Sequence, residues 1–336
     1  AILTVIFIFT CEFTCVEAMP GVSAQAYIVI DAQSGRILKS HNENKRLPIA
    51  STTKIMTAIL AIETIDDLNQ RIEVPPECSG IEGSSIYLRP KQMVSVIDLL
   101  YGTMLRSGND AAETLSKFAG RNNPEGFISM MNKKAKELGA LNTNFENANG
   151  LHDDNHYSTA YDLSLISAYA MKNDTFRKIV STEKYKAESM NNMFYNKNKV
   201  VYQYKYGTGI KIGFTKAAGR CIVASAEKDG TEIIAVLLND NNWFNDSYQI
   251  FDWAFENYKY YSIVEKGQFV KYTPERNPVF IGESFRCVLT DKEIKQIRFE
   301  ALIKPELMSN DSETKTCGTY NIYLGKTKLG TGYLIR

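Results

Sequence analysis

The chain has 336 residues, and its 39 lysine and arginine residues nearly balance 38 aspartate and glutamate residues, for a formal net charge of +1. This balance gives no electrostatic reason to expect a nucleic-acid partner. Hydrophobic residues make up 44% and charged residues 23%, which excludes a disordered, collagen-like or coiled-coil chain, and the length suggests about two domains. The only three histidines are His41, His152 and His156, so function is expected to rest largely on other residue types.

The chain begins with an apolar run, AILTVIFIFT, which is too short to span a membrane but has the length of the core of a secretory signal. We therefore expect residues 1–26 to be a signal segment, trimmed at its front, and the protein to be exported to the cell envelope or beyond. Val16-Glu17-Ala18 and Ala24-Gln25-Ala26 both offer small residues suited to cleavage. Association with the membrane or the wall is left open.

Two of the six cysteines lie in the expected signal segment. Of the others, Cys287 and Cys317 belong to the same C-terminal segment and can pair in an oxidising compartment. Cys78 and Cys221 have apolar neighbours and are interpreted as small buried residues.

The predicted elements begin with a β-hairpin over residues 26–31 and 36–39. The apolar spacing then changes to a helical period, which predicts helices over 51–63, 94–105, 109–121, 124–138 and 159–172. Strands are predicted at 209–215, 219–227 and 231–239, followed by an amphipathic helix over 246–260 that can cover one face of a sheet.

From about residue 262 onward, short β-like runs alternate with turn residues, and no helical period remains. The runs fall at 267–272, 285–289, 297–303, 320–324 and 330–335. We therefore predict an α+β fold in which a domain over 27–261, an antiparallel sheet with a helical region, precedes a small all-β sandwich over 262–336.

Ser51 and Lys54 stand three residues apart at the start of a predicted helix, which places the hydroxyl and the amine on one face. Serine is a weak nucleophile and needs a base, which can be a lysine kept partly neutral by desolvation or by a neighbouring cation. The spacing alone is unspecific, since Ser-x-x-Lys recurs at Ser181, Ser225 and Ser312.

Two further groups strengthen the assignment of Ser51. Ser107 and Asn109 lie at the junction of two predicted helices and can point into one cleft, although ordinary helix capping would use the same residue types. Lys211 and Gly213 lie on a predicted strand, where the lysine can hold a substrate and the glycine allows close backbone approach.

In this order the three groups match the Ser-x-x-Lys, Ser-x-Asn and Lys-Thr-Gly set of penicillin-binding proteins and serine β-lactamases. The surrounding sequence resembles the low-molecular-weight D-alanyl-D-alanine carboxypeptidases, penicillin-binding serine peptidases that remove the terminal D-alanine of peptidoglycan stem peptides. The resemblance covers roughly residues 26–260, and the β-rich tail more weakly. It rests on LPIASTTKIMTA at 47–58, GSSIYL at 83–88, DLLYGTMLRSGNDAA at 98–112, NGL at 149–151, HYSTA at 156–160 and FTKAAGRC at 214–221.

The resemblance implies a penicillin-binding, β-lactamase-like catalytic domain with Ser51 as the acylated nucleophile, Lys54 as its base and Ser107 as a proton relay. It also implies that β-lactams are covalent inhibitors and that no cofactor is needed. The backbone N–H groups of Ser51 and Phe214 would form the oxyanion hole. The residues that would bind and orient the peptide are Asn109, Lys211, Gly213, Phe214 and Thr215.

Two departures from the family pattern concern recognition of the substrate's terminal carboxylate. Ile212 replaces the threonine that follows the strand lysine, and Trp243 stands near the place of an arginine present in several members. Thr215 can partly compensate. Loss of one hydrogen bond to a charged group weakens binding about ten- to a hundredfold, so weakened carboxypeptidase activity is expected while acylation is retained.

Two rival functions remain. A zinc peptidase cleaving the same bond would use His152 and His156 with Asp153 or Asp154, but the adjacent Asn149-Gly150 indicates a loop, where the i, i+4 spacing of a helix is absent. His156 is interpreted instead as a structural hydrogen-bonding residue. A non-catalytic or weakly active peptidoglycan-binding homologue is the second rival.

Overall fold

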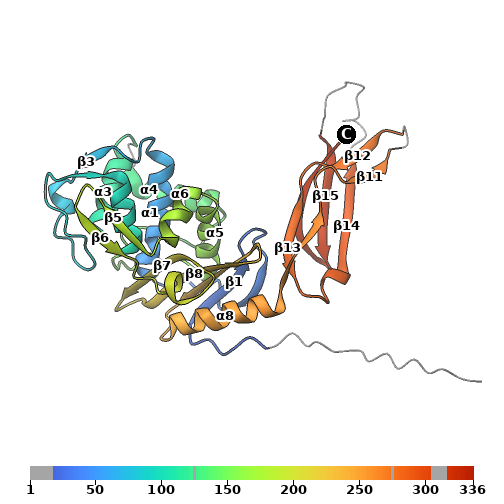
Figure 1. Cartoon of the computed structure of the whole chain (residues 1–336), viewed down its shortest axis with the longest axis horizontal. Coiled ribbons are helices and arrows are strands. Elements are labelled where there is room, and N and C mark those ends of the chain that lie inside the picture. Colours follow the sequence, from blue (N-terminus) through green and yellow to red (C-terminus); the bar gives the residue numbers. More distant parts are fainter. Residues whose placement is uncertain (1–17, 124–125, 274–275, 304–315) are drawn as a thin grey trace, which may run out of the picture.

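The structure is a computed structural model that describes residues 18–123, 126–273, 276–303 and 316–336. It has two parts (Figure 1): an N-terminal part that combines a sheet with helices, and a C-terminal part made of strands that stands beside it. The α+β fold class predicted from the sequence is confirmed. Most of the predicted signal segment, residues 1–17, lies outside the described residues.

The N-terminal part is built on a five-stranded antiparallel sheet with the strand order β2-β1-β9-β8-β7. The first strand of the chain pairs with the last strand of this part, from Ala26 opposite Leu238 to Asp31 opposite Ile233. The sheet comprises β1 (Ala26–Asp31), β2 (Ile37–His41), β7 (Gly207–Thr215), β8 (Gly219–Lys228) and β9 (Thr231–Leu238). Strand β7 therefore lies at one edge, and no other strand of the described residues pairs with its outer side.

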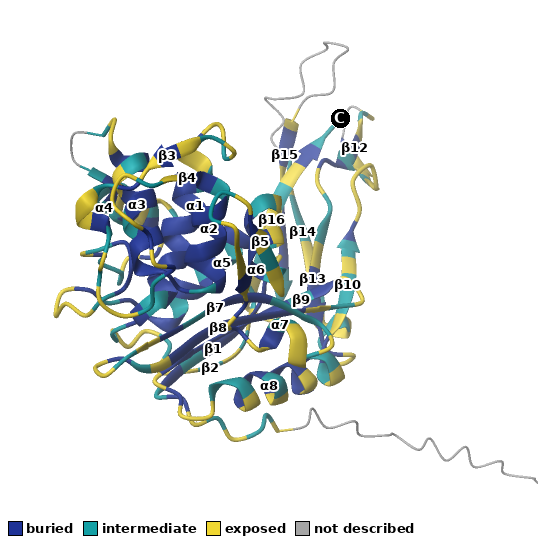
Figure 2. Cartoon of the chain, turned by 60° about the vertical axis from the view of Figure 1, so that its left-hand side comes forward, coloured by how far each residue is buried: buried dark blue, intermediate teal, exposed yellow. Residues whose placement is uncertain are grey.

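Both faces of the central strands are buried, which explains why β8 and β9 read as nearly continuous apolar runs. One face packs against a group of helices that shares its apolar core. Helices α1 (Lys54–Thr64), α5 (Ala160–Met171) and α6 (Asp174–Ser181) contact the strands, and α2 (Val96–Leu105), α3 (Asn109–Gly120) and α4 (Gly126–Glu137) pack on α1. Figure 2 shows α1 and α2 almost entirely buried within this group.

The opposite face of the sheet is covered by α8 (Trp243–Asn257), as the amphipathic pattern predicted. The helix starts three residues before the predicted 246 and stops earlier than 260, because Tyr258 is already extended and leads into a strand. Ile250, Phe251 and Ala254 pack against β8 and β9 from this side.

Short elements complete the N-terminal part. A 3₁₀ turn, η1 (Ala50–Thr53), precedes α1, so Ser51 lies just before the α-helix and Lys54 is its first residue. Val94 lies in a strand and not in the helix predicted over 94–105. Helix α6 was not predicted from the sequence. The same holds for these short elements: β3 (Arg71–Glu73) paired with β4 (Met93–Ser95), β5 (Lys184–Ala187) paired with β6 (Asn192–Tyr195), η2 (Pro76–Cys78) and α7 (Val200–Gln203).

The C-terminal part contains two antiparallel sheets. Residues of both sheets, including Val264, Val279 and Leu334, share one apolar cluster. The smaller sheet pairs β10 (Lys259–Val264) with β13 (Phe285–Leu289). The larger sheet has the strand order β11-β12-β16-β15-β14. Its strands are β11 (Phe269–Tyr272), β12 (Pro278–Ile281), β14 (Ile297–Ile303), β15 (Thr316–Leu324) and β16 (Thr327–Ile335). A 3₁₀ turn, η3 (Ile294–Gln296), precedes β14. The boundary predicted at residue 262 falls within β10.

Polar contacts join the two parts. Arg36, which follows β1, forms an ion pair with Glu293 and also donates to the backbone oxygen of Val288. The Val288 N–H in turn donates to the buried carboxylate of Asp31 at 3.4 Å. The end of β1 is therefore a junction where β13 and the turn after it contact the N-terminal part.

The four cysteines outside the predicted signal segment are free and buried. Cys287 lies on β13, in the smaller sheet, whereas Cys317 lies on β15 in the larger sheet and packs in its core. The possible Cys287–Cys317 disulfide is therefore not formed, and burial of Cys78 and Cys221 is as expected. Among the described residues, no helix is both long and apolar enough to cross a membrane.

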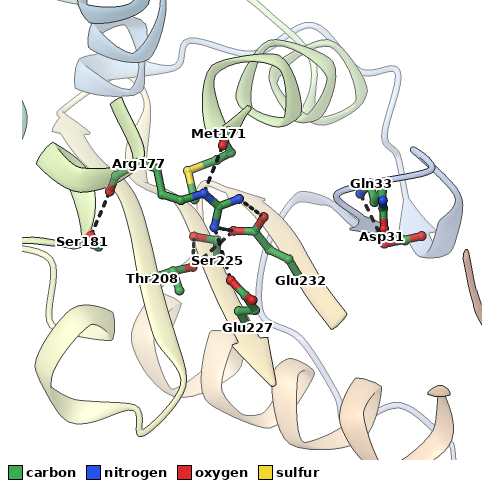
Figure 3. A network of polar contacts seen from close by, with 9 residues as sticks. All are labelled: Asp31, Gln33, Met171, Arg177, Ser181, Thr208, Ser225, Glu227 and Glu232. Carbon is green, nitrogen blue, oxygen red and sulfur yellow. Dashed lines mark hydrogen bonds and ion pairs between the residues drawn. The ribbon is translucent and has the colours of Figure 1, made fainter. Parts of the chain in front are cut away.

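Helix α6 is tied to the end of the sheet by a network centred on Arg177 (Figure 3). The guanidinium donates to both carboxylate oxygens of Glu232 on β9, at 3.0 and 2.6 Å, and to Glu227 on β8 at 3.3 Å. The hydroxyls of Thr208 on β7 and Ser225 on β8 are hydrogen-bonded at 2.8 Å. This network fixes the edge strand β7 relative to the helices.

Candidate active site

Ser51 and Lys54 are brought together by the turn that leads into α1. The Lys54 Nζ donates to Ser51 Oγ at 2.9 Å and to Asn109 Oδ1 at 2.7 Å. It also donates to the backbone oxygen of Asn149, which accepts a 3.4 Å hydrogen bond from the Ser51 hydroxyl. The spacing of three residues thus places the amine next to the hydroxyl.

The Lys54 side chain is completely buried, and desolvation of its ammonium form holds the pKa of Lys54 well below its usual value. The positive charge of Lys211 lowers this pKa further, whereas Glu113 and Asp110 act in the opposite direction. A lysine with a lowered pKa is more often neutral, and a neutral amine can accept the proton of Ser51.

Ser107 and Asn109 occupy the junction between α2 and α3. Ser107 is buried and has a positive φ of 63°, a left-handed conformation that only a tightly held turn imposes on a non-glycine residue. The Asn109 side chain accepts from Lys54 and donates to the backbone oxygen of Glu82 at 2.6 Å. Within the described part of the chain, no hydrogen bond joins the Ser107 hydroxyl to Ser51 or Lys54.

Lys211 is also buried, and its Nζ donates to the backbone oxygen of Ile212 at 2.9 Å. Desolvation, assisted by the charge of Lys197, lowers the pKa of Lys211 to about 7. Gly213 explains how β7 approaches Ser51: a Cβ at this position would lie 2.8 Å from the Ser51 nitrogen. Only glycine allows this approach between the edge strand and η1.

The two residues after Gly213 differ in exposure. The Phe214 side chain is 62% exposed, and its backbone belongs to the edge strand. The Thr215 hydroxyl accepts the Ala218 N–H at 3.0 Å, so it stabilises the turn between β7 and β8 and keeps its own proton to donate.

Ile212 packs among apolar residues on the α8 side of the sheet. It contacts the same cluster as Trp243 and Phe244, and it is only partly buried. Lys211, its neighbour on the strand, is oriented to the opposite face, as the alternation of a strand requires. The structure therefore gives Ile212 and Trp243 a shared packing role, and their effect on carboxylate recognition stays a prediction.

Sequence reasoning missed the contribution of Asn149. Its backbone oxygen contacts both Ser51 and Lys54, and its side-chain amide donates to Glu113 Oε1 at 2.7 Å. Gly150 follows with a φ of 82° and packs so closely on Ala50 that a Cβ would lie 2.1 Å from its backbone oxygen. The Asn-Gly pair signalled a turn, but no local pattern indicates which distant helix the turn contacts.

His156 has a structural role, as expected. Its Nε2 is 2.8 Å from the Thr53 hydroxyl, and its Nδ1 accepts the Glu146 N–H at 3.1 Å. Burial lowers the pKa of His156 to about 4, so the ring is neutral. Both ring nitrogens are engaged by protein groups, whereas zinc binding requires one of them to be free. Among the described residues, no cluster of three metal-ligating side chains is present.

An α+β domain with a serine, a buried lysine of lowered pKa and a second lysine on an adjoining edge strand defines the class of serine acyl-transfer enzymes that use lysine as the base. The family model of D-alanyl-D-alanine carboxypeptidases matches residues 14–242. The chain belongs to this family.

Curated relatives agree with this membership. The D-alanyl-D-alanine carboxypeptidase DacF of Bacillus subtilis is 33% identical over 257 residues, which are 74% of this chain and 66% of that protein. The D-alanyl-D-alanine carboxypeptidase DacC of Escherichia coli is 33% identical over 273 residues, or 74% of this chain and 64% of that protein. The chain thus spans slightly less than two thirds of these two relatives.

Solved structures show the same fold. Penicillin binding protein 5 from Haemophilus influenzae superimposes with a TM-score of 0.81 at 24% identity, covering 95% of this chain and 98% of that chain. A mutant of the Streptomyces K15 DD-transpeptidase superimposes with a TM-score of 0.67 at 29% identity, covering 70% of this chain and 99% of that chain. The C-terminal β part is therefore shared with the first structure.

Proposed function

We propose that the protein is a penicillin-binding, serine-type D-Ala-D-Ala carboxypeptidase that removes the terminal D-alanine from peptidoglycan stem peptides. The observation that carries this proposal is the 2.9 Å hydrogen bond between the buried Lys54 Nζ, whose pKa is strongly lowered, and Ser51 Oγ. Family membership supplies the substrate class.

In the proposed reaction, neutral Lys54 takes the Ser51 proton as Ser51 Oγ attacks the carbonyl carbon of the scissile D-Ala–D-Ala bond. The oxygen of the tetrahedral intermediate receives hydrogen bonds from the backbone N–H groups of Ser51 and Phe214. The departing D-alanine nitrogen takes the proton held by Lys54 as the C–N bond breaks, which leaves an acyl-serine and a neutral Lys54. Lys54 then takes a proton from the water that adds to the ester and returns it to Ser51 Oγ as the ester C–O bond breaks, which releases the shortened peptide as its acid.

Lys211 and β7 supply binding in this scheme. A protonated Lys211 attracts the terminal carboxylate of the substrate, while Asn109 holds Lys54 and orients the peptide. The free side of the edge strand β7 offers backbone groups to an extended peptide. A β-lactam presents a carboxylate and a strained amide to the same groups, so it should acylate Ser51.

We predict that a fluorescent penicillin labels the protein on Ser51 and that Ser51→Ala abolishes the label. Release of D-alanine from a peptide ending in D-Ala-D-Ala should depend on the same residue. EDTA should change neither result. Label found on another residue by mass spectrometry would contradict the site, and loss of activity with a chelator would restore the zinc peptidase as the better explanation.

Transfer to an amine is the second candidate reaction, favoured by the likeness to the K15 DD-transpeptidase. Both reactions share the acyl-serine and differ in whether water or an amine resolves it. Incubating a labelled peptide ending in D-Ala-D-Ala with and without an amino-acid acceptor distinguishes the two reactions. Only transpeptidation yields a product in which the peptide is joined to the acceptor. A non-catalytic binding homologue would give neither product nor penicillin label.

We further propose that the protein is exported and that cleavage occurs after Ala18. The apolar run at the start of the chain supports export. Ser23 supports the choice of site, because its backbone N–H donates to Asp246 at 2.7 Å and its hydroxyl bonds Asp240, contacts that cleavage after Ala26 would remove. Amino-terminal sequencing of the exported protein tests the proposal, and a first residue at Tyr27 would refute it.

A further inference from the structure

Helix α3 places one carboxylate directly behind the catalytic lysine. Glu113 follows Asn109 by one helical turn, so both side chains lie on the face of α3 turned toward the site. Its Oε1 accepts the Asn149 side-chain amide at 2.7 Å, and the backbone of Ala148 forms a hydrogen bond to the same carboxylate. Glu113 is thus the α3 partner of the segment Ala148–Asn149.

The segment is held on its other side by α1. The Thr57 hydroxyl donates to the Ala148 backbone oxygen at 2.6 Å. Between these two attachments the Asn149 backbone oxygen accepts hydrogen bonds from Lys54 and Ser51. A carbonyl that accepts from both the base and the nucleophile fixes their separation, so anything that shifts the segment also shifts the proton-transfer geometry.

The position of Glu113 is unfavourable for a carboxylate that serves only to stabilise the fold. It is largely buried, and desolvation raises its pKa. In the described part of the chain, no lysine or arginine forms an ion pair with it. It also lines a cavity of about 430 Å³ between α3 and α4, together with the exposed Glu146.

We propose that Glu113 is a positioning residue that holds the Asn149 carbonyl against Lys54 and Ser51 and whose negative charge opposes release of the Lys54 proton. The proposal deepens the function proposed above and rests on it, because Lys54 is taken to be the base. Glu113 therefore affects two separable quantities: the rate of acylation when Lys54 is neutral, and the pH at which Lys54 becomes neutral.

The charged groups that face Lys54 determine the direction of the second effect. Lys211 on β7 and Lys197 in the segment before α7 favour the neutral amine, whereas Glu113 and Asp110 on α3 favour the ammonium. Removing the charge of Glu113 leaves the other three groups in place. The pKa of Lys54 should then fall, so that the base becomes available at lower pH.

Two variants and one control separate charge from position. Glu113→Gln removes the charge and keeps one oxygen that can accept the Asn149 hydrogen bond, whereas Glu113→Ala removes both the charge and the acceptor. Glu146→Gln is the control, because it removes a carboxylate that lines the same cavity but is exposed and does not contact Asn149. The measurement is the second-order rate constant of acylation by a fluorescent penicillin between pH 5 and pH 9, values chosen to bracket neutrality, at about 25 °C.

We expect the acid limb of the Glu113→Gln profile to move to lower pH with its maximum rate retained. The maximum rate of Glu113→Ala should fall about tenfold or more, the scale of one lost buried hydrogen bond. Glu146→Gln should follow the wild type. Thermal unfolding of each variant shows whether it is folded. If Glu113→Ala is misfolded, the pH profile of Glu113→Gln alone tests the proposal.

An unchanged acid limb in folded Glu113→Gln would overturn the electrostatic effect, and an unchanged maximum rate in folded Glu113→Ala would overturn the positioning effect. An NMR titration of the Lys54 side chain in the unacylated wild type and in Glu113→Gln reads the same pKa difference directly. If the wild type is not acylated at all, the proposed function fails, whereas the titration still decides whether Glu113 acts on Lys54.

Discussion

The two buried lysines of the site need opposite protonation states during the proposed reaction. Lys54 must be neutral to accept a proton, and Lys211 must be charged to attract a carboxylate. The pKa of Lys211 is lowered to about 7, so its charge is lost as the pH rises through neutrality. We expect kcat/KM for the peptide to rise with pH as Lys54 loses its proton and to fall again near pH 7 as Lys211 loses its own.

Lys197 offers a test of this pH dependence. Its charge lowers the pKa of Lys211 and, to a smaller extent, that of Lys54. Lys197→Met should therefore raise both pKa values and move both limbs of the kcat/KM profile to higher pH. Lys199→Met, a change of the same size two residues away, is the control and should leave the limbs in place. Limbs that stay fixed in the Lys197 variant would show that other groups set the profile.

The replacement of the family threonine by Ile212 gives a second prediction at this scale. Ile212→Thr should raise kcat/KM for a peptide ending in D-Ala-D-Ala about tenfold, the effect of one hydrogen bond to a carboxylate. The gain should appear in peptide turnover more than in penicillin acylation. Because Ile212 packs with Trp243, Tm must be measured in parallel. Unchanged turnover in a stable variant would show that position 212 does not reach the substrate.

At the scale of elements, Arg177 adds polar contacts to the apolar packing of α6 on the sheet. The Glu232 side chain is only 11% exposed and is paired with Arg177 through both oxygens. Arg177→Ala should lower the free energy of unfolding by roughly 1–3 kcal/mol, because a largely buried carboxylate loses its partner. Urea denaturation measures this change.

Glu227, the more exposed of the two carboxylates bound by Arg177, provides the matched comparison. The Glu227 side chain is 46% exposed, and its contact with Arg177 is a single 3.3 Å hydrogen bond. Glu227→Gln should therefore change the free energy of unfolding by less than about 1 kcal/mol. Equal effects of the Arg177 and Glu227 substitutions would show that burial of Glu232 does not set the strength of the network.

At the scale of the whole molecule, every residue of the proposed site precedes β10, so the C-terminal part should be dispensable for acylation. A chain ending at residue 261 should fold and be labelled on Ser51. It should also have a lower Tm, because Arg36 loses Glu293 and the apolar cluster under α8 loses Val288. A folded but unlabelled truncated protein would show that the C-terminal part contributes to the site. The full-length Glu293→Ala variant is the control for loss of the ion pair alone.

Much of the architecture could be predicted because its signals are local. The first hairpin, the central strands and helices α3 and α5 lie within a few residues of their predicted bounds, since apolar periodicity and turn residues reflect neighbours along the chain. The elements that were missed are short. The apolar spacing of α6 spans only a few positions, and β5 and β6 pair across a tight turn without a long alternating pattern.

The sequence alone determined which residues carry the proposed chemistry. Ser51 and Lys54 are three positions apart, and a helical turn of that length places a hydroxyl and an amine on one face. Only the tertiary structure decided how those groups behave. Burial of Lys54 and Lys211 lowers both pKa values, and Asn149 and Glu113 join the site from segments remote in the chain. The physical reason is that desolvation and long-range hydrogen bonds depend on packing between distant segments, which no local pattern records.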